Sequence, residues 1–240
     1  MLFRIFHRQS SVESMAKPRE LIEEMPPKFK EYRRFPRIPL HQPKPITDSF
    51  QSLIDGRVSE RDYTISKSVS LDDISTILAV GPGLNKSREN KKEEIPLPRH
   101  HPSGGALYPL ECYLAAFRVE GLSVGIYHYA PQEHALEHLI ISKAPENIRE
   151  ACKGLIPDSN PAAALIITGV WGRNYPKYGE LAYRLTLIEA GHMMQDMLLA
   201  ARSRAVKSFP LVGFRQQVIA EELDILSDIE DPLYMGFLGK

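Results

Sequence analysis

The apolar residues of this chain follow two periods, and the longer pattern is helical. From Tyr178 to Arg202 one apolar stripe recurs every three or four residues, formed by Tyr183, Leu187, Ala190, Met194, Met197 and Ala201. A second apolar face of the same segment consists of Leu181, Leu185, Ile188 and Leu198. A helix that is apolar on two sides is buried on two sides, so we expect it in a large core or between subunits.

Shorter apolar runs predict strands. Residues 111–118 read as a buried strand, and residues 162–170, rich in branched side chains, read as a central strand. Residues 125–129 and 134–139 predict a hairpin that turns at residues 131–133, and residues 234–238 predict a closing strand. A sheet with helices packed against it follows from these elements.

Capping signals place the remaining helices. Thr47-Asp48 offers an N-cap for residues 49–55, and Ser70 stands at capping-box spacing before Asp73. Further helices are expected over residues 145–153 and 215–224, with one near the N-terminus that ends by Glu24.

The proline-rich segment 25–46 has no period. It indicates an extended arm on a neighbouring surface or a partner subunit, with a disordered tail as the alternative. We therefore divide the chain into an arm, residues 1–46, and a domain, residues 47–240.

The composition of the chain bears on which partners it binds and in which cellular compartment it works. The 240 residues contain 30 Lys+Arg and 30 Asp+Glu, a balance that argues against nucleic acid as a partner. The apolar runs are shorter than the roughly 20 residues of a membrane span, and the first residues lack the pattern of a signal peptide. The two cysteines, Cys112 and Cys152, form no CxxC pair. No metal site and a cytoplasmic location are expected.

The most informative short stretch is Pro102-Ser103-Gly104-Gly105-Ala106-Leu107-Tyr108-Pro109-Leu110-Glu111. Two glycines permit positive φ and let a flat ligand approach the backbone, while Ser103 adds a hydroxyl. Pro109 favours an extended exit into the strand that follows. The stretch predicts a loop that holds a cofactor against a sheet, although an ordinary loop before a strand fits equally well.

Three further pieces could belong to the same site. Arg57, Ser59 and Arg61 place two guanidinium groups and a hydroxyl where a phosphate could bind. Val212-Gly213 could turn backbone N–H groups toward the acceptors of a ring, and Lys240 could reach the same phosphate. The alternatives are a solvated charged loop for the first piece and a frayed end for Lys240.

In order and spacing these pieces resemble the nitroreductase superfamily, and most closely its branch of SagB-type (azoline) dehydrogenases. The resemblance covers about residues 50–240; its most specific segments are 102–111, 177–180, 183–184 and 189–192. It implies an α+β fold, a three-layer sandwich with a mixed central sheet flanked by helices. It also implies an interlocked homodimer with flavin mononucleotide (FMN) at the subunit interface, which would explain the two apolar faces of the 178–202 helix.

The resemblance also assigns roles by position. It places the FMN phosphate and ribityl chain against Arg57, Ser59 and Arg61, and the isoalloxazine ring against Ser103, Gly104 and Gly105. It places the N5 and O4 edge of the ring against the backbone of Val212 and Gly213, and a basic residue near the phosphate at Lys240. Lys177 and Tyr178 match a lysine–tyrosine pair that removes a proton while hydride goes to flavin. Spacing alone favours Lys177 as a surface lysine and Tyr178 as a packing residue.

The function implied is dehydrogenation of a thiazoline or oxazoline in a ribosomally made peptide, with a cyclodehydratase as partner. One alternative is a general NAD(P)H-dependent reductase of nitro compounds or quinones. Another is a flavin-free binding subunit on the same fold. Among the accessory residues, Glu189 is expected to pair with Arg184 or a helix neighbour, and His100 and His101 to be loop residues near the flavin.

Overall fold

The computed structural model describes residues 2–11, 26–88, 98–139, 145–154 and 160–240. Its strands are β1 (Arg37–Pro39), β2 (Leu110–Ala116), β3 (Gly125–Ala130), β4 (Ala135–Leu139), β5 (Ala163–Val170), β6 (Lys207–Leu211) and β7 (Glu230–Gly239). Its α-helices are α1 (Leu2–Gln9), α2 (Phe50–Gly56), α3 (Leu71–Val80), α4 (Glu146–Glu150), α5 (Tyr175–Tyr178), α6 (Leu181–Ser203) and α7 (Gln216–Leu223). Short 3-10 turns are η2 (Lys86–Arg88), η3 (Gly104–Ala106) and η4 (Trp171–Arg173).

The seven strands form one sheet in the order β1-β4-β3-β2-β5-β7-β6. All the pairs between these strands are antiparallel, whereas a mixed sheet was expected. Parallel pairing in the described residues is limited to the isolated bridges Ser59–Ser208 and Val69–Val119. The apolar run 162–170 becomes β5, which lies between β2 and β7 and is buried along its whole length. Its predicted central position is thereby confirmed.

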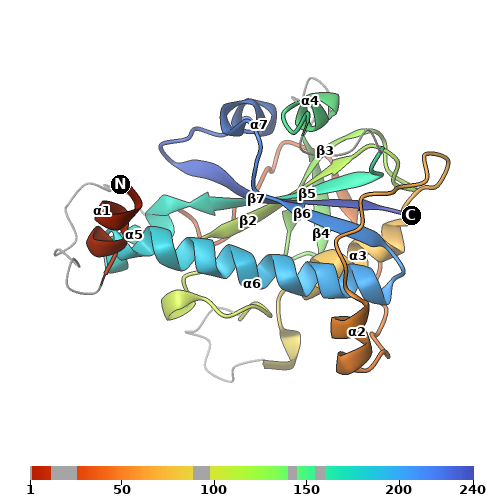
Figure 1. Cartoon of the computed structure of the whole chain (residues 1–240), viewed down its shortest axis with the longest axis horizontal. Helices are drawn as coiled ribbons and strands as arrows, with labels where there is room; N and C mark the ends of the chain where they lie inside the picture. Colours follow the sequence, from red (N-terminus) through yellow and green to blue (C-terminus); the bar gives the residue numbers. More distant parts are fainter. Residues whose placement is uncertain (1, 12–25, 89–97, 140–144, 155–159) are drawn as a thin grey trace.

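Helices cover both faces of the sheet, which gives three layers (Figure 1). On one face α3 and α6 pack over a cluster that includes Ile74, Ile77, Met193 and Met194. On the other face α4 and α7 cover a second cluster around Ile148, Leu223 and Phe237. The expected α+β architecture is confirmed, because each sheet face has its own buried apolar cluster under helices.

The capping signals act as predicted at the start of α3. The Ser70 hydroxyl accepts a hydrogen bond from the backbone N–H of Asp73 at 3.1 Å. At α2 the cap is Ser49, so the helix begins one residue later than expected. The 178–202 pattern divides into the short α5 and the long α6, because Gly179 between them adopts φ 53°. The predicted N-terminal helix ends at Gln9, and residues 12–25 lie outside the described residues.

The arm lies on the chain's own sheet over residues 26–40. Lys30 inserts its ammonium between Glu230 at 2.7 Å and the Tyr113 hydroxyl at 2.8 Å. Arg37 on β1 bonds the buried Glu137 at 2.8 Å, and β1 pairs with β4 as the edge strand of the sheet. These contacts fix this part of the arm across the sheet and extend the sheet by one short strand.

Candidate active site

The glycine loop adopts a left-handed backbone over several residues. Gly105 has φ 65°, and Ala106 and Tyr108 have φ 55° and 48° although they carry side chains. Ser103 stabilises this path, because its carbonyl accepts from the N–H of Ala106 at 3.1 Å and its hydroxyl accepts from the N–H of Tyr108 at 2.9 Å. The Ser103 oxygen therefore shapes the loop, and its hydrogen remains available to a ligand.

Lys177 and Tyr178 converge on this loop. A Cβ built on Gly105 would lie 2.7 Å from the Lys177 Nζ and 2.7 Å from the Tyr178 hydroxyl oxygen. The same ammonium lies 5.3 Å from the centre of the Tyr178 ring. An amine and a phenol thus meet at a position where any side chain would displace them. The structure brings together the loop and the pair that the resemblance assigned to one site.

Two buried polar side chains hold the turn that carries this pair. Asn174 donates to the Thr186 hydroxyl at 2.8 Å and to the Ala182 carbonyl at 3.3 Å, which ties the turn to α6. Arg173 donates to the Tyr108 carbonyl at 3.2 Å, to the Pro27 carbonyl at 2.9 Å and to Glu111. Arg173 therefore joins the arm, the end of the glycine loop and the turn that carries Lys177 and Tyr178.

A buried pair lies behind the loop. The His101 ring has no exposed surface, and it contacts Glu189 at 3.1 Å and the Gly81 carbonyl at 3.2 Å. The expectation that Glu189 pairs with Arg184 is wrong, because Arg184 binds His7 and Ser10 of the N-terminal segment. His101 anchors the chain two residues before Ser103, and its partner Glu189 belongs to α6, so this helix supports the glycine loop. Nothing in the sequence indicated this contact, because the two residues are far apart along the chain.

The predicted phosphate segment lies against β6. Ser59 forms a bridge with Ser208, and the N–H of Glu60 donates to the Ser208 carbonyl at 2.9 Å. The Arg61 guanidinium lies 3.9 Å from the centre of the Phe209 ring. Arg57 ends α2, where its N–H bonds the Leu53 carbonyl. The segment is thus held by backbone and stacking contacts, while the Arg57, Ser59 and Arg61 side chains are at least partly accessible.

Val212 and Gly213 continue β6 beyond its last pair. Val212 is 65% exposed, so the turn presents its backbone to solvent. Ser208 precedes Val212 by four residues, or about 13 Å along an extended strand. The phosphate segment and this turn therefore lie along one edge of the molecule, separated by a stretch that a ribityl chain would have to cross.

Lys240 is engaged inside the chain. Its ammonium contacts Asp73 at 3.0 Å and the Arg204 carbonyl at 3.0 Å, and its backbone carbonyl accepts from Thr64. Arg204 also bonds Asp73, at 2.9 Å. The predicted phosphate contact of Lys240 would require this arrangement to open.

The two groups of residues lie at opposite ends of α6. At its N-terminal end, Leu185 lies where a Cβ of Gly104 would be 3.3 Å away, and at its C-terminal end Arg202 packs on Gly56. Seventeen residues separate these contacts, which is about 25 Å of helix. Figure 1 shows α6 running the width of the molecule between the two ends. We call these two groups of predicted site residues half-sites, since most of the length of α6 separates them within one chain.

Apolar side chains of α6 remain partly exposed between the half-sites, although Tyr183 also packs on Phe6 and Trp171. Tyr183, Leu187 and Ile188 are 41%, 38% and 51% exposed. One turn further on, a Cβ placed on the exposed Gly191 would have no neighbour within 4 Å. The exposed residues come from both apolar faces predicted from the sequence, Tyr183 and Leu187 from the first and Ile188 from the second. Each predicted face is therefore buried further along the helix, at Met194 and Leu198, and partly exposed in the N-terminal half of α6.

Two features are absent from the described residues. In the described segments, no three His, Cys, Asp or Glu residues stand close enough to hold a metal ion. Within the same ranges, no helix combines the length and apolar character that crossing a bilayer requires.

The sequence profile of the nitroreductase family matches residues 54–240, and the chain belongs to this family. It is accordingly an oxidoreductase of the nitroreductase type, which confirms the family resemblance drawn from the sequence.

Its relatives include two peptide-processing proteins. The microcin B17-processing protein McbC of Escherichia coli is 30% identical over 149 residues, which are 59% of this chain and 54% of McbC. The trifolitoxin-processing protein TfxB of Rhizobium leguminosarum bv. trifolii is 29% identical over 106 residues, 42% of this chain and 28% of TfxB. The protein MJ1384 of Methanocaldococcus jannaschii is 28% identical over 184 residues, 77% of this chain and 87% of MJ1384. The chain thus spans about half of McbC, and its kinship with such proteins agrees with the SagB-type branch.

Solved structures share the fold. McbBCD, the E. coli microcin synthetase complex with truncated pro-MccB17 bound, contains a chain with TM-score 0.64 and 22% identity; the match covers 100% of this chain and 91% of that one. A nitroreductase-family structure from Ralstonia eutropha has TM-score 0.70 and 19% identity over 91% of this chain and 96% of that one. A structure from Exiguobacterium sibiricum, solved in complex with FMN, has TM-score 0.57 and 13% identity over 82% and 90%.

Proposed function

We propose that this protein is an FMN-dependent dehydrogenase that oxidises an azoline ring in a modified peptide. One observation carries the proposal: the Lys177 amine and the Tyr178 hydroxyl meet at Gly105, in the loop assigned to the flavin. Hydride transfer to a flavin alone needs no base at this position. Conversion of an azoline to an azole removes a hydride and a proton from adjacent atoms, so a base close to the ring is required.

The residues present fit FMN as a group shared by two copies of the chain. Gly105 leaves a cradle that a Cβ would fill, and Arg57 and Arg61 offer guanidinium groups to a phosphate. Because the half-sites of one chain are about 25 Å apart along α6, the ring-facing loop would come from one copy and the phosphate segment from the other. The exposed apolar face of α6 is the surface on which the two copies would pair. Its Gly191 would allow close approach of two helices.

The chain's own residues would bind and handle protons. FMN, when bound, supplies the acceptor for the hydride. Lys177 and Tyr178 would take the proton from the carbon beside the one that loses hydride, while Arg173 keeps their turn in place. Arg57, Ser59 and Arg61 would hold the phosphate, and the N–H groups of Val212 and Gly213 would donate to the ring edge.

The relatives support the substrate class and the kind of partner. McbC and TfxB are named for processing microcin B17 and trifolitoxin, and the McbBCD structure is a synthetase complex with a precursor bound. We infer that this protein acts on a ribosomally made peptide and assembles with a cyclodehydratase, which supplies the azoline.

The decisive experiment mixes the FMN-loaded protein with a thiazoline-containing peptide in the absence of oxygen and nicotinamide. Loss of the oxidised flavin absorbance together with a two-hydrogen mass loss in the peptide would support the proposal. Lys177→Ala should keep flavin but slow this reaction, whereas Arg57→Ala with Arg61→Ala should lose flavin. Flavin that is reduced by NADH or NADPH but never by the peptide would instead indicate a general reductase. A colourless protein that takes up no FMN would indicate a flavin-free binding subunit.

A further inference from the structure

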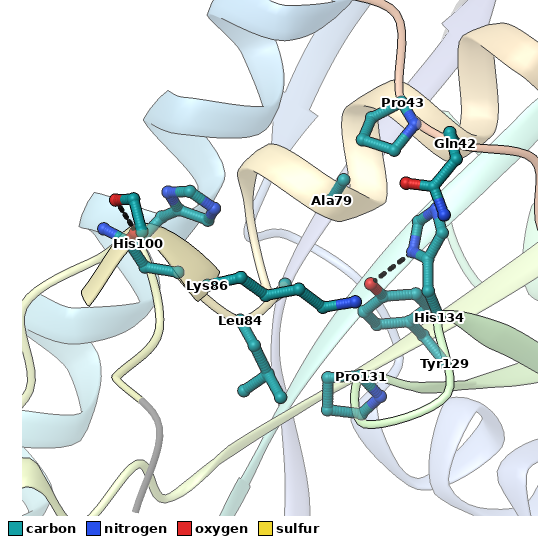
Figure 2. A pocket seen from close by; sticks show the side chains of 12 residues that line it. Gln42, Pro43, Ala79, Leu84, Lys86, His100, Tyr129, Pro131 and His134 are labelled. Carbon is teal, nitrogen blue, oxygen red and sulfur yellow. Dashed lines mark hydrogen bonds between the residues drawn. The ribbon is translucent and has the colours of Figure 1, made fainter. Parts of the chain in front are cut away.

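One cavity is lined by residues that belong to neither half-site. It has a volume of about 280 Å³ and lies between the C-terminal end of α3, the loop that follows it and the β3–β4 turn. Figure 2 shows its lining, which consists of Gln42, Pro43, Ala79, Gly83, Leu84, Asn85, Lys86, Ser87, His100, Tyr129, Pro131 and His134. None of the residues assigned to FMN or to proton transfer is among them. Small-molecule pockets typically have this make-up, with apolar walls and a few convergent polar groups.

Lys86 provides the charge of this cavity. Its side chain crosses the cavity so that the ammonium points toward Tyr129 and His134 (Figure 2). No aspartate or glutamate is among the described residues that line the cavity. Within the described part of the chain, the Lys86 ammonium forms no hydrogen bond or ion pair. An ammonium on an apolar wall therefore has hydrogens to offer to an incoming acceptor.

The hydrogen-bond partners of His134 require a neutral ring, so this residue adds no charge to the cavity. The Ser75 hydroxyl donates to the His41 carbonyl at 2.5 Å, so its oxygen must accept the contact of 2.8 Å from the His134 Nε2–H. The other ring nitrogen, Nδ1, then accepts from the Tyr129 hydroxyl at 2.8 Å. Burial lowers the pKa of His134, which agrees with this neutral tautomer.

His100 and Tyr129 also add no charge to the cavity. Burial also lowers the pKa of His100, so this ring is neutral near pH 7. The Tyr129 hydrogen is committed to His134, and burial raises the pKa of Tyr129. The cavity thus carries a single positive charge.

We propose that this cavity binds a small organic carboxylate, with the anionic group on Lys86 and a short apolar or aromatic body against Pro43, Leu84 and Pro131. A monoanion matches one ammonium, whereas a phosphate dianion is commonly held by several cations or by the fork of an arginine. The cavity volume admits a ligand of about the size of one substituted ring.

The cavity lies close to the glycine loop. A measurement that reports on individual residues is therefore needed to tell a ligand in the cavity from a ligand at the loop. His100 lines the cavity, and its neighbour His101 is bonded to Glu189 and to the Gly81 carbonyl beneath the loop. The test therefore has to locate the ligand as well as detect it.

The test uses the full chain saturated with FMN and benzoate as the probe. We expect benzoate to bind with a dissociation constant of about 1 mM or tighter in calorimetry. We also expect it to shift the methyl signals of Ala79 and Leu84 in nuclear magnetic resonance spectra. Benzamide, which has the same shape and no charge, should bind at least about tenfold more weakly, since a charge-assisted hydrogen bond is lost.

Two variants complete the test. Lys86→Met keeps the length of the side chain and removes its charge, so benzoate affinity should fall about tenfold or more. Lys67→Met changes the same charge at an exposed site outside the cavity and should leave the affinity unchanged. Absence of benzoate binding, equal binding of benzamide, or equal affinity in Lys86→Met would overturn the proposal. Shifts at Leu185 rather than Leu84 would assign the probe to the redox half-site and would also overturn it. Tighter binding of inorganic phosphate than of benzoate would also overturn the proposal, because the cavity would then prefer a different class of anion.

Discussion

Replacement of Gly105 by alanine tests the geometry of the proposed active site most directly. At φ 65° an alanine costs of order 1 kcal/mol in backbone strain, which the fold should tolerate. Its Cβ would start 2.7 Å from the Lys177 Nζ and the Tyr178 hydroxyl oxygen, and ordinary contact begins at 3.4 Å. These are the ends of flexible side chains, so both would move by about 0.7 Å or more. A misplacement of roughly 1 Å can cost about a hundredfold in rate.

The assay is single-turnover reduction of bound flavin by a thiazoline peptide, together with the melting temperature and the flavin content of each variant. Gly154→Ala is the matched control, since Gly154 has φ 81° and a Cβ there would meet nothing within 4 Å. Both variants should lose similar stability, but only Gly105→Ala should lose about two orders of magnitude in rate. Equal rates in the two variants would show that Lys177 and Tyr178 do not act at Gly105.

Three further predictions concern the proposed dimer, the buried arginine and pH. Gly191→Leu should weaken self-association measured by sedimentation, while Gly191→Ala should disturb it less; unchanged association in Gly191→Leu would place the interface elsewhere. Arg173→Met should lower the free energy of unfolding by about 3–5 kcal/mol in urea titrations, because it removes the buried guanidinium partner of Glu111 and leaves that carboxylate only its contacts with His128 and the Lys30 N–H; a loss below about 1 kcal/mol would contradict this account. Burial alone would lower the pKa of His128, but its bonds to Glu111 and Glu137 outweigh burial and raise this pKa. The stability that His128 contributes is therefore complete below about pH 6.5 and lost as pH rises through the raised value, and His128→Gln should flatten that part of the melting-temperature curve.

Local signals gave the elements of the fold well. The apolar run at 162–170 predicted β5, and the serine before Leu71 predicted the start of α3, because each depends only on neighbouring residues. Strand direction was less accessible to such signals. The resemblance implied a mixed sheet, whereas the pairs between the named strands are antiparallel, and direction depends on connections that no short window contains.

The candidate site was predictable as a set of pieces, but their relative positions were not. Gly105 and Lys177 are far apart in sequence, and only the packing of the turn before α6 brings them together. The buried partners of Arg173 and His101 were not predicted, because a buried polar side chain takes its role from partners elsewhere in the chain. The engagement of Lys240 by Asp73 has the same origin. Residue type and spacing identify candidates, whereas partner choice is a property of the folded chain.

The separation of the half-sites by the length of α6 has a genetic consequence. If each catalytic centre combines one end of α6 from one copy with the opposite end from the other, two inactive alleles can complement each other. A copy without Arg57 and Arg61 mixed with a copy without Lys177 would form a heterodimer with one centre broken twice and one centre intact. Half of the active centres of such hybrids would then work, although neither parent homodimer has a complete one.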